Sequence, residues 1–136
     1  MRTVLLAVFC ACVPWGSLHA QSFDGDWSVL QVCEGTQEGA RGFTWRYGAR
    51  VKDGRFLGQY REKGQSPSMS LEGRINADGT ASLSARGISG SADFNQKFAA
   101  TATPISFEVM ARFTGTSGTG DRVGSRVCKF TFAKTG

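Results

Sequence analysis

Hydrophobic and polar residues alternate from Phe43 to Val51, which is the most regular stretch of the chain. Every second residue there is aromatic or aliphatic, and the residues between them are polar or glycine. A period of two is typical of a β-strand that has one face in a core and the other in water. The Asp53-Gly54 pair that follows tolerates the positive φ angles of a tight turn, and the alternation then resumes through Tyr60. We therefore predict a β-hairpin over Gly42–Tyr60.

Similar alternation predicts further strands on both sides of this hairpin. They cover Trp27–Cys33, Met69–Asn76, the residues around 81–85 after an Asp78-Gly79 turn, Ile105–Phe113 and Val123–Lys134. The polar or glycine-rich stretches between strands are expected to be loops: Glu34–Arg41, Glu62–Ser68 and Gly115–Asp121. Within the last of them, Gly115–Gly120 is expected to be mobile. Gly87–Thr103 has no clear pattern, which leaves open a short irregular strand or a loop across one end of the sheet. No stretch has the period of an amphipathic helix of useful length.

The first twenty residues have the layout of a secretory signal peptide, with a basic start, an apolar run over Val4–Val13 and a small residue, Ala20, at a plausible cleavage point. A membrane anchor is a weaker interpretation, because the run is far shorter than the roughly 20 residues that a span needs. Lipidation of Cys10 or Cys12 is disfavoured by the bulky Phe9 in front of them. We predict that residues 1–20 direct export to the periplasm or out of the cell, and that residues 21–136 form one β-barrel domain with no transmembrane segment.

Removal of residues 1–20 leaves two of the four cysteines, Cys33 and Cys128. In an oxidising compartment an isolated pair predicts a disulfide, and the close C-x-x-C spacing of a redox pair is absent. The two cysteines lie in the first and the last predicted strands, so the bond would join the two ends of the domain.

The predicted fold class is all-β: a single small antiparallel domain of seven to eight strands, either an up-and-down barrel or a sandwich. We favour the barrel, because consecutive hairpins leave the first and last strands as open edges unless those two strands pair. A Cys33–Cys128 disulfide would hold them together at that seam.

Residues 21–136 also lack histidine, because the only one in the chain is His19. Ser-His-Asp and Cys-His arrangements are therefore excluded, and one disulfide-bonded cysteine pair cannot supply a typical zinc site. Glu72 and Glu108 are expected on outward faces, in ion pairs with nearby arginines rather than as a glycosidase pair. We predict a protein that is not an enzyme and that uses no metal and no cofactor.

The exported part is basic: it keeps all 11 acidic residues and loses only Arg2 of the 16 basic ones, which leaves a net charge of +4. Arginines on the outward faces of successive strands either keep the barrel soluble or form a face for an anionic partner. The candidate binding face consists of Arg46, Arg50, Arg55, Arg61, Arg74 and Arg112. A nucleic-acid partner is not expected for an exported protein.

Four aromatic residues are predicted to point inward: Trp27, Trp45, Tyr47 and Tyr60. They would either fill the interior of a small barrel or line a cavity for an apolar or aromatic ligand. We favour filling, because a domain of this length leaves little spare volume.

Five segments resemble a small exported β-domain of rhizobia and related bacteria, which occurs alone or after a caspase-like peptidase domain: FDGDW, VKDGRFLG, INADGTA, ARFTG and RVCKFTF. The resemblance spans most of residues 21–136 and implies export and a β-fold, but no reaction. A weaker resemblance, to lipocalin and avidin-type barrels, is carried by Gly25-Asp26-Trp27 and Arg126. In lipocalins an arginine of the last strand covers a tryptophan of the first, which implies that Arg126 covers Trp27.

The leading functional hypothesis is a non-catalytic binding module of the bacterial envelope, acting as a monomer on an unidentified protein or anionic component through the loops and the arginine face. A second hypothesis is a periplasmic protease inhibitor that inserts Gln21-Ser22-Phe23 into a protease cleft. A third is a lipocalin-like carrier of a small ligand.

Overall fold

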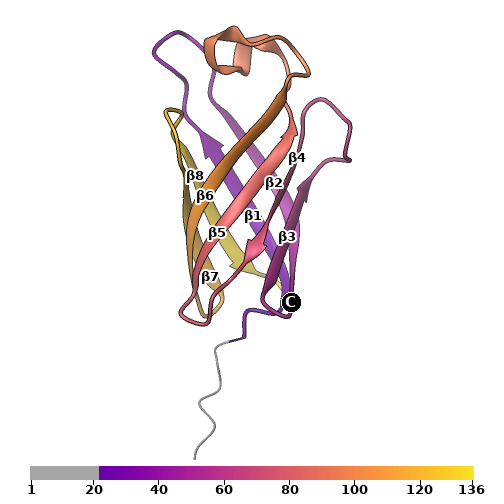
Figure 1. Cartoon of the computed structure of the whole chain (residues 1–136), viewed down its shortest axis with the longest axis vertical. Coiled ribbons are helices and arrows are strands. Elements are labelled where there is room, and N and C mark those ends of the chain that lie inside the picture. Colours follow the sequence, from indigo (N-terminus) through magenta and orange to yellow (C-terminus); the bar gives the residue numbers. More distant parts are fainter. Residues whose placement is uncertain (1–21) are drawn as a thin grey trace, which may run out of the picture.

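The computed structural model describes residues 22–136, and they form one closed antiparallel barrel whose eight strands pair in chain order. The predicted signal peptide, with Cys10, Cys12 and Ala20, lies outside the described residues. Figure 1 shows the barrel with its axis upright. The strands are β1 (Gly25–Cys33), β2 (Phe43–Lys52), β3 (Arg55–Tyr60), β4 (Ser68–Arg74), β5 (Thr80–Ile88), β6 (Pro104–Thr114), β7 (Ser117–Arg122) and β8 (Cys128–Lys134).

The barrel closes because β1 pairs with β8 as well as with β2. The β1–β8 ladder runs from Trp27 opposite Lys134 to Cys33 opposite Cys128. The two cysteines form a disulfide across this seam. The predictions of a barrel rather than a sandwich, and of a disulfide between the first and last strands, are confirmed.

The two ends of the barrel differ in their connections. At one end, called here the closed end, three short turns join β2 to β3, β4 to β5 and β6 to β7, and the C-terminal Gly136 is hydrogen-bonded to Asp26. At the other, the open end, four longer connections span residues 34–42, 61–67, 89–103 and 123–127. Residues 89–103 contain two single 3₁₀ turns, η1 (Ala92–Phe94) and η2 (Gln96–Phe98), and lie across the open end in Figure 1, in orange. This segment is called the lid, and it corresponds to the loop alternative predicted for Gly87–Thr103.

Aromatic side chains fill the closed end. The Trp27 ring meets the Phe113 ring edge-on, with 5.4 Å between centroids. The Trp27 indole Nε1–H donates to the carbonyl oxygen of Phe23 at 2.7 Å. Phe23 is itself buried against Phe113. Phe23 therefore belongs to the core, and it is not available as part of the inserting arm that the protease-inhibitor hypothesis requires.

The prediction of a loop over Gly115–Asp121, mobile over Gly115–Gly120, is wrong, because most of this stretch is β7. Gly118 and Gly120 face the interior and are buried. They lie opposite Phe132 and Phe130 of β8 in the ladder. Strands with inward glycines leave room for large neighbouring side chains, which supply the packing that glycine lacks.

The last strand begins later than predicted, at Cys128 instead of Val123. Residues 123–127 are a loop at the open end, and Gly124 in it has a φ of 130°, which favours glycine. Arg126 consequently lies at the open end, whereas Trp27 is at the closed end. The implied covering of Trp27 by Arg126 is therefore wrong. Among residues 22–136, no helix is long and apolar enough to span a membrane.

Candidate functional site

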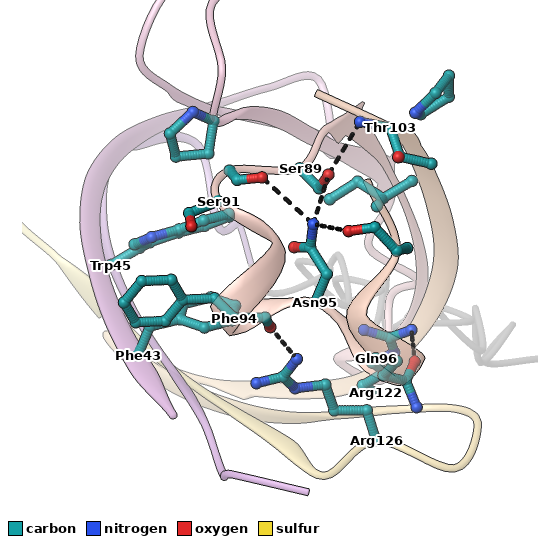
Figure 2. Close-up of a pocket in the computed structure, with 15 residues that line it drawn as sticks. Phe43, Trp45, Ser89, Ser91, Phe94, Asn95, Gln96, Thr103, Arg122 and Arg126 are labelled. Atoms are coloured by element: carbon teal, nitrogen blue, oxygen red, sulfur yellow. Dashed lines mark hydrogen bonds between the residues drawn. The ribbon is translucent and has the colours of Figure 1, made fainter. Parts of the chain in front are cut away.

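A cavity of about 510 Å³ lies at the open end, between the lid and the ends of the strands next to it (Figure 2). Most of its lining is apolar, and its polar groups come mainly from the lid and from two arginines. The lining residues are Phe43, Trp45, Pro67, Ser89, Gly90, Ser91, Phe94, Asn95, Gln96, Ala99, Thr103, Pro104, Ile105, Arg122 and Arg126.

Aromatic rings of β2 form one wall of this cavity, and a ring of β3 packs against them. Phe43 and Trp45 both point inward, as the alternation along β2 requires, and their ring centroids are 4.6 Å apart. The ring of Trp45 is stacked on that of Tyr60, with 4.3 Å between centroids and 11° between planes. Trp45 is only half-buried, so one part of its ring remains available to a ligand.

The four predicted aromatic residues thus divide between the two alternatives. Trp27 and Tyr47 fill the interior, as expected. Trp45 lines the cavity and Tyr60 supports it from behind, so the preference for filling is wrong at the open end.

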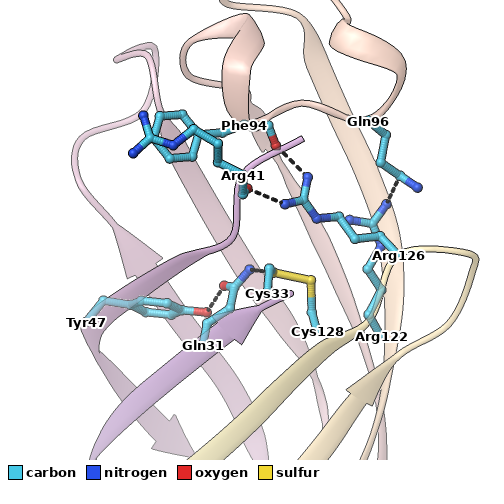
Figure 3. Close-up of a disulfide and its surroundings, with 9 residues drawn as sticks. All are labelled: Gln31, Cys33, Arg41, Tyr47, Phe94, Gln96, Arg122, Arg126 and Cys128. Atoms are coloured by element: carbon cyan, nitrogen blue, oxygen red, sulfur yellow. Dashed lines mark hydrogen bonds between the residues drawn. A yellow bond between two sulfur atoms is a disulfide. The ribbon is translucent and has the colours of Figure 1, made fainter. Parts of the chain in front are cut away.

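A short chain of buried polar groups includes the disulfide (Figure 3). The Tyr47 hydroxyl donates to Gln31 Oε1 at 3.2 Å, and Gln31 Nε2 donates to Cys33 Sγ at 3.5 Å. Burial raises the pKa of Tyr47 well above its usual value. Tyr47 therefore stays protonated as a hydrogen-bond donor and cannot act as a base at neutral pH.

The lid is held in shape by Asn95. The side-chain Nδ2 of Asn95 donates to the carbonyl oxygen of Ala99 at 2.8 Å and to Ser89 Oγ at 3.1 Å. Ser89 Oγ also accepts the backbone N–H of Thr103 at 3.0 Å, which ties the start of the lid to its end. Three non-glycine residues of the lid have positive φ angles, namely Lys97, Phe98 and Ala102. Such angles are strained for these residue types, so the side-chain contacts determine the lid's conformation.

Two arginines complete the cavity wall beneath the lid. The guanidinium carbon of Arg122 lies 4.1 Å from the centroid of the Phe107 ring, and its Nη2 donates to Gln96 Oε1 at 3.2 Å. The guanidinium carbon of Arg126 lies 5.1 Å from the centroid of the Phe43 ring.

Arg126 is the more buried of the two, with only 4% of its surface exposed. Its Nη2 donates to the carbonyl oxygen of Arg41 at 2.9 Å, and its Nη1 donates to that of Phe94. These contacts connect the loop after β1, the lid and the loop before β8, as Figure 3 shows. Arg126 therefore organises the open end.

Neither arginine forms an ion pair with a carboxylate of residues 22–136. The three ion pairs of residues 22–136 are all at the exposed outer surface and involve Arg50, Arg55 and Lys129. Burial lowers the pKa of Arg122, and the positive charge of Arg126 lowers it further. Burial also lowers the pKa of Arg126, although Glu38 acts on it in the opposite direction. Both stay charged, because a guanidinium does not deprotonate in proteins, so the cavity wall carries two cations.

Comparison of the chain with protein-family models, curated proteins and solved structures gave no match.

The predicted arginine face is on the outer surface and apart from the cavity. All six arginines are exposed: Arg46, Arg50, Arg55, Arg61, Arg74 and Arg112. Arg50 pairs with Asp26 at 3.0 Å, and Arg55 approaches Glu72 at 3.7 Å. Arg55 lies directly opposite Arg74 in the ladder of β3 and β4.

The two mid-strand carboxylates lie on the outer face of the barrel, on strands that are not neighbours. Both are exposed, and Ser84 lies between Glu72 and Glu108 in the ladders of β4, β5 and β6. Glu72 pairs with Arg55, not with Arg74, and Glu108 accepts a hydrogen bond from Ser84 Oγ at 2.8 Å. The expected ion pair of Glu108 with a nearby arginine is therefore wrong. Within the described chain, no three His, Cys, Asp or Glu side chains come together as metal ligands.

Sequence reasoning did not select Arg122, Asn95 or Gln96 as site residues, and it selected Arg126 for a different contact. One signal was present for the arginines: they belong to a stretch, residues 122–136, that has four basic residues and no acidic one. No signal in the sequence identified the lid residues, because their role depends on contacts with distant segments.

Proposed function

We propose that this protein is a non-catalytic binding protein that holds a small, largely apolar ligand in the cavity at the open end of its barrel. Small-molecule sites in proteins typically have volumes of about 300–1,000 Å³, mostly apolar and aromatic linings and a few well-placed polar groups. The cavity of about 510 Å³ beside Phe43, Trp45 and Ile105 fits this description, and it is the observation that carries the proposal.

The lid supports the same function. A ligand in the cavity would be covered by residues 89–103, whose inner side contributes Phe94, Ala99 and Thr103 to the lining. Since Trp45 is rigidly stacked on Tyr60, one aromatic surface of the site is already in place before a ligand arrives. Preorganisation of this kind lowers the entropic cost of binding.

The proposal includes export of the protein to the periplasm or out of the cell. It is supported by the signal-peptide layout of residues 1–20 and by the disulfide between Cys33 and Cys128, since such bonds persist in oxidising compartments.

The experiment is a titration with N-phenyl-1-naphthylamine, an uncharged fluorophore whose emission rises in apolar surroundings. We expect saturable binding to the wild type, and loss of binding in Ile105→Trp, which places a large ring in the cavity. The matched control is Met110→Trp, which adds the same ring to the exposed outer face of the same strand. Circular dichroism confirms that each variant folds. Absence of saturable binding to the wild type, or equal binding to the Ile105→Trp variant, contradicts the proposal.

A second candidate function is supported by a row of basic residues on the outer face near the closed end. Arg55 lies opposite Lys52 of β2 on one side and Arg74 of β4 on the other. Like charges directly opposite each other in a ladder are destabilising, which favours an anionic partner for this row. We propose contact with anionic head groups of the bacterial envelope.

Co-sedimentation with phosphatidylglycerol vesicles tests this second function. Binding should decrease with added salt and in the Arg55→Gln/Arg74→Gln variant, while Arg86→Gln on the outer face of β5 serves as the control for charge. Absent or salt-independent binding overturns it without affecting the cavity proposal.

A further inference from the structure

We propose that the cavity ligand is an amphipathic organic anion, whose apolar body lies against Phe43, Trp45 and Ile105 and whose carboxylate or sulfonate head is held by Arg122 and Arg126. This inference rests on the proposed function and names the class of ligand.

The first argument is the mixture of an apolar wall with two cations that form no ion pair; only the more distant Glu38 acts on one of them, Arg126. Most of the lining suits hydrocarbon or aromatic groups, yet Arg122 and Arg126 both line the same space. Burial of a charged group without an opposite charge is costly, and neither arginine has a carboxylate partner among residues 22–136. A ligand anion would provide the missing charge, and it would offset the repulsion between the two guanidinium groups at the same time.

The second argument is that both guanidinium groups have hydrogen-bonding capacity that the protein leaves unused. Arg122 Nε and Arg126 Nε are buried and have no hydrogen-bond partner. Buried polar atoms almost always find a partner in folded proteins, so two such atoms on neighbouring cations mark an unusual site. A guanidinium presents several N–H groups in a planar fork that matches a carboxylate or a sulfonate.

The third argument is that the arginines are already held in position. The rings of Phe107 and Phe43 pack against their guanidinium groups, and the acceptors on the lid and on Arg41 fix the orientation of the Nη atoms. A rigid pair of cations loses little conformational entropy when an anion binds.

A purely structural role is the alternative, since Arg122 and Arg126 also hold the lid in place by hydrogen bonds to Gln96 and Phe94. The two roles make different predictions. Loss of a residue that only holds the lid weakens the binding of every ligand, whether charged or neutral, because the lid loosens. Loss of an anion-binding group weakens the binding of anions selectively.

The experiment compares 2-naphthoate, 2-naphthalenesulfonate and the neutral 2-naphthamide, each measured by displacement of N-phenyl-1-naphthylamine at pH 7. The three probes share one apolar body, and only their heads differ. On the wild-type protein we expect at least one of the two anions to bind about ten-fold or more tightly than the amide, as a charge-assisted hydrogen bond implies. The comparison of naphthoate with naphthalenesulfonate identifies the preferred head.

The variants Arg122→Met and Arg126→Met test the assignment of the head-group site. Each should reduce the preference for the anion about ten-fold, while Arg122→Lys should retain part of it. The control, Arg86→Met, removes an exposed positive charge from the outer face of β5 and should leave the preference unchanged. Arg126 connects three loops, so the Arg126→Met variant can fail to fold. In that case the Arg122 variants and the preference of the wild type still test the inference.

Equal binding of the amide and both anions to the wild type overturns this inference but leaves the proposed function intact. The same holds if the Met variants weaken all three probes alike, or if Arg86→Met abolishes the preference. Absence of saturable N-phenyl-1-naphthylamine binding to the wild type, on which the displacement measurement depends, overturns the proposed function itself.

Discussion

Gly118 faces the ring of Phe113 across the ladder of β6 and β7, so closely that a Cβ atom on Gly118 would lie 2.9 Å from Phe113 Cδ1. The same Cβ would lie 3.0 Å from the carbonyl oxygen of Arg112. Both distances are shorter than ordinary van der Waals contact. The glycine in β7 is therefore required by the volume of its neighbour, and the wide interior of the closed end is filled by Phe113 and Phe132 instead.

Gly118→Val should destabilise the protein by about 1–3 kcal/mol, because extra atoms in a well-packed core force neighbouring side chains and backbone to shift. Urea unfolding followed by tryptophan fluorescence measures the change. Thr119→Val is the matched control, since Thr119 is exposed on the outer face of the same strand. Equal stability of the two variants would show that the interior near Phe113 is less tightly packed than described.

Removal of the disulfide in Cys33→Ala/Cys128→Ala should lower the free energy of unfolding by about 4 kcal/mol. The reason is that the bond links residues 95 positions apart, and the chain-entropy model assigns a large constraint on the unfolded chain to a loop of this length. Urea midpoints for the variant and for the wild type with and without reductant provide the measurement. Reduced wild type that keeps the full stability of the oxidised protein would contradict the prediction.

Asp24 should make the stability of the closed end depend on acid pH. Its carboxylate accepts the backbone N–H groups of Gly54 and Asp53, at 3.1 Å and 2.8 Å, and these bonds lower its pKa below the usual 3.8. A lowered pKa in the folded state stabilises the protein above the unfolded-state pKa, and this contribution is lost as the pH falls through the folded-state pKa.

Asp24→Ala should therefore be less stable than the wild type at pH 7, and the difference should shrink as the pH falls below about 3.8. Asp24→Asn keeps an acceptor but does not titrate, so its stability relative to Asp24→Ala should not change with pH. Chemical denaturation at a series of pH values distinguishes these cases. A wild-type advantage that persists at the lowest pH would contradict the assigned role of the carboxylate.

Asn95→Ala should loosen the lid without unfolding the barrel. The strained positive φ angles of Lys97 and Phe98 are held by the side-chain contacts of Asn95, and each such residue costs of the order of 1 kcal/mol or more. Hydrogen exchange should become faster in residues 89–103, while the strands remain protected. Asn76→Ala, in the turn between β4 and β5 at the closed end, is the control. Unchanged exchange in the lid would show that other contacts determine its conformation.

The sequence predicts the barrel well because alternation and turn residues act locally. The pattern around Trp45 places β2 and its turn correctly, and the positions of Cys33 and Cys128 predict the seam. Alternation does not predict β7, because Gly118 and Gly120 have no side chains to alternate. Their role is visible only beside Phe130 and Phe132, which lie opposite them.

The candidate site is harder to predict, because it depends on how far each inward side chain lies from the open end of the barrel. Alternation shows that both Trp45 and Tyr47 point inward, but it does not show that one of them meets the cavity and the other meets packed core. The position of Arg126 required the knowledge that residues 123–127 form a loop. The lid conformation depends on hydrogen bonds between Asn95 and backbone groups that have no sequence signature.

The hydrogen bonds between Gly136 and Asp26 bring the C-terminus to the same end as the short turns, on the side away from the lid (Figure 1). A fusion partner or a sensor-chip linkage attached to Gly136 would therefore leave the open end of the barrel facing solution. By the same reasoning, the four longer connections can be varied in a library without disturbing the point of attachment, so the molecule can serve as a scaffold for selecting new ligand specificities.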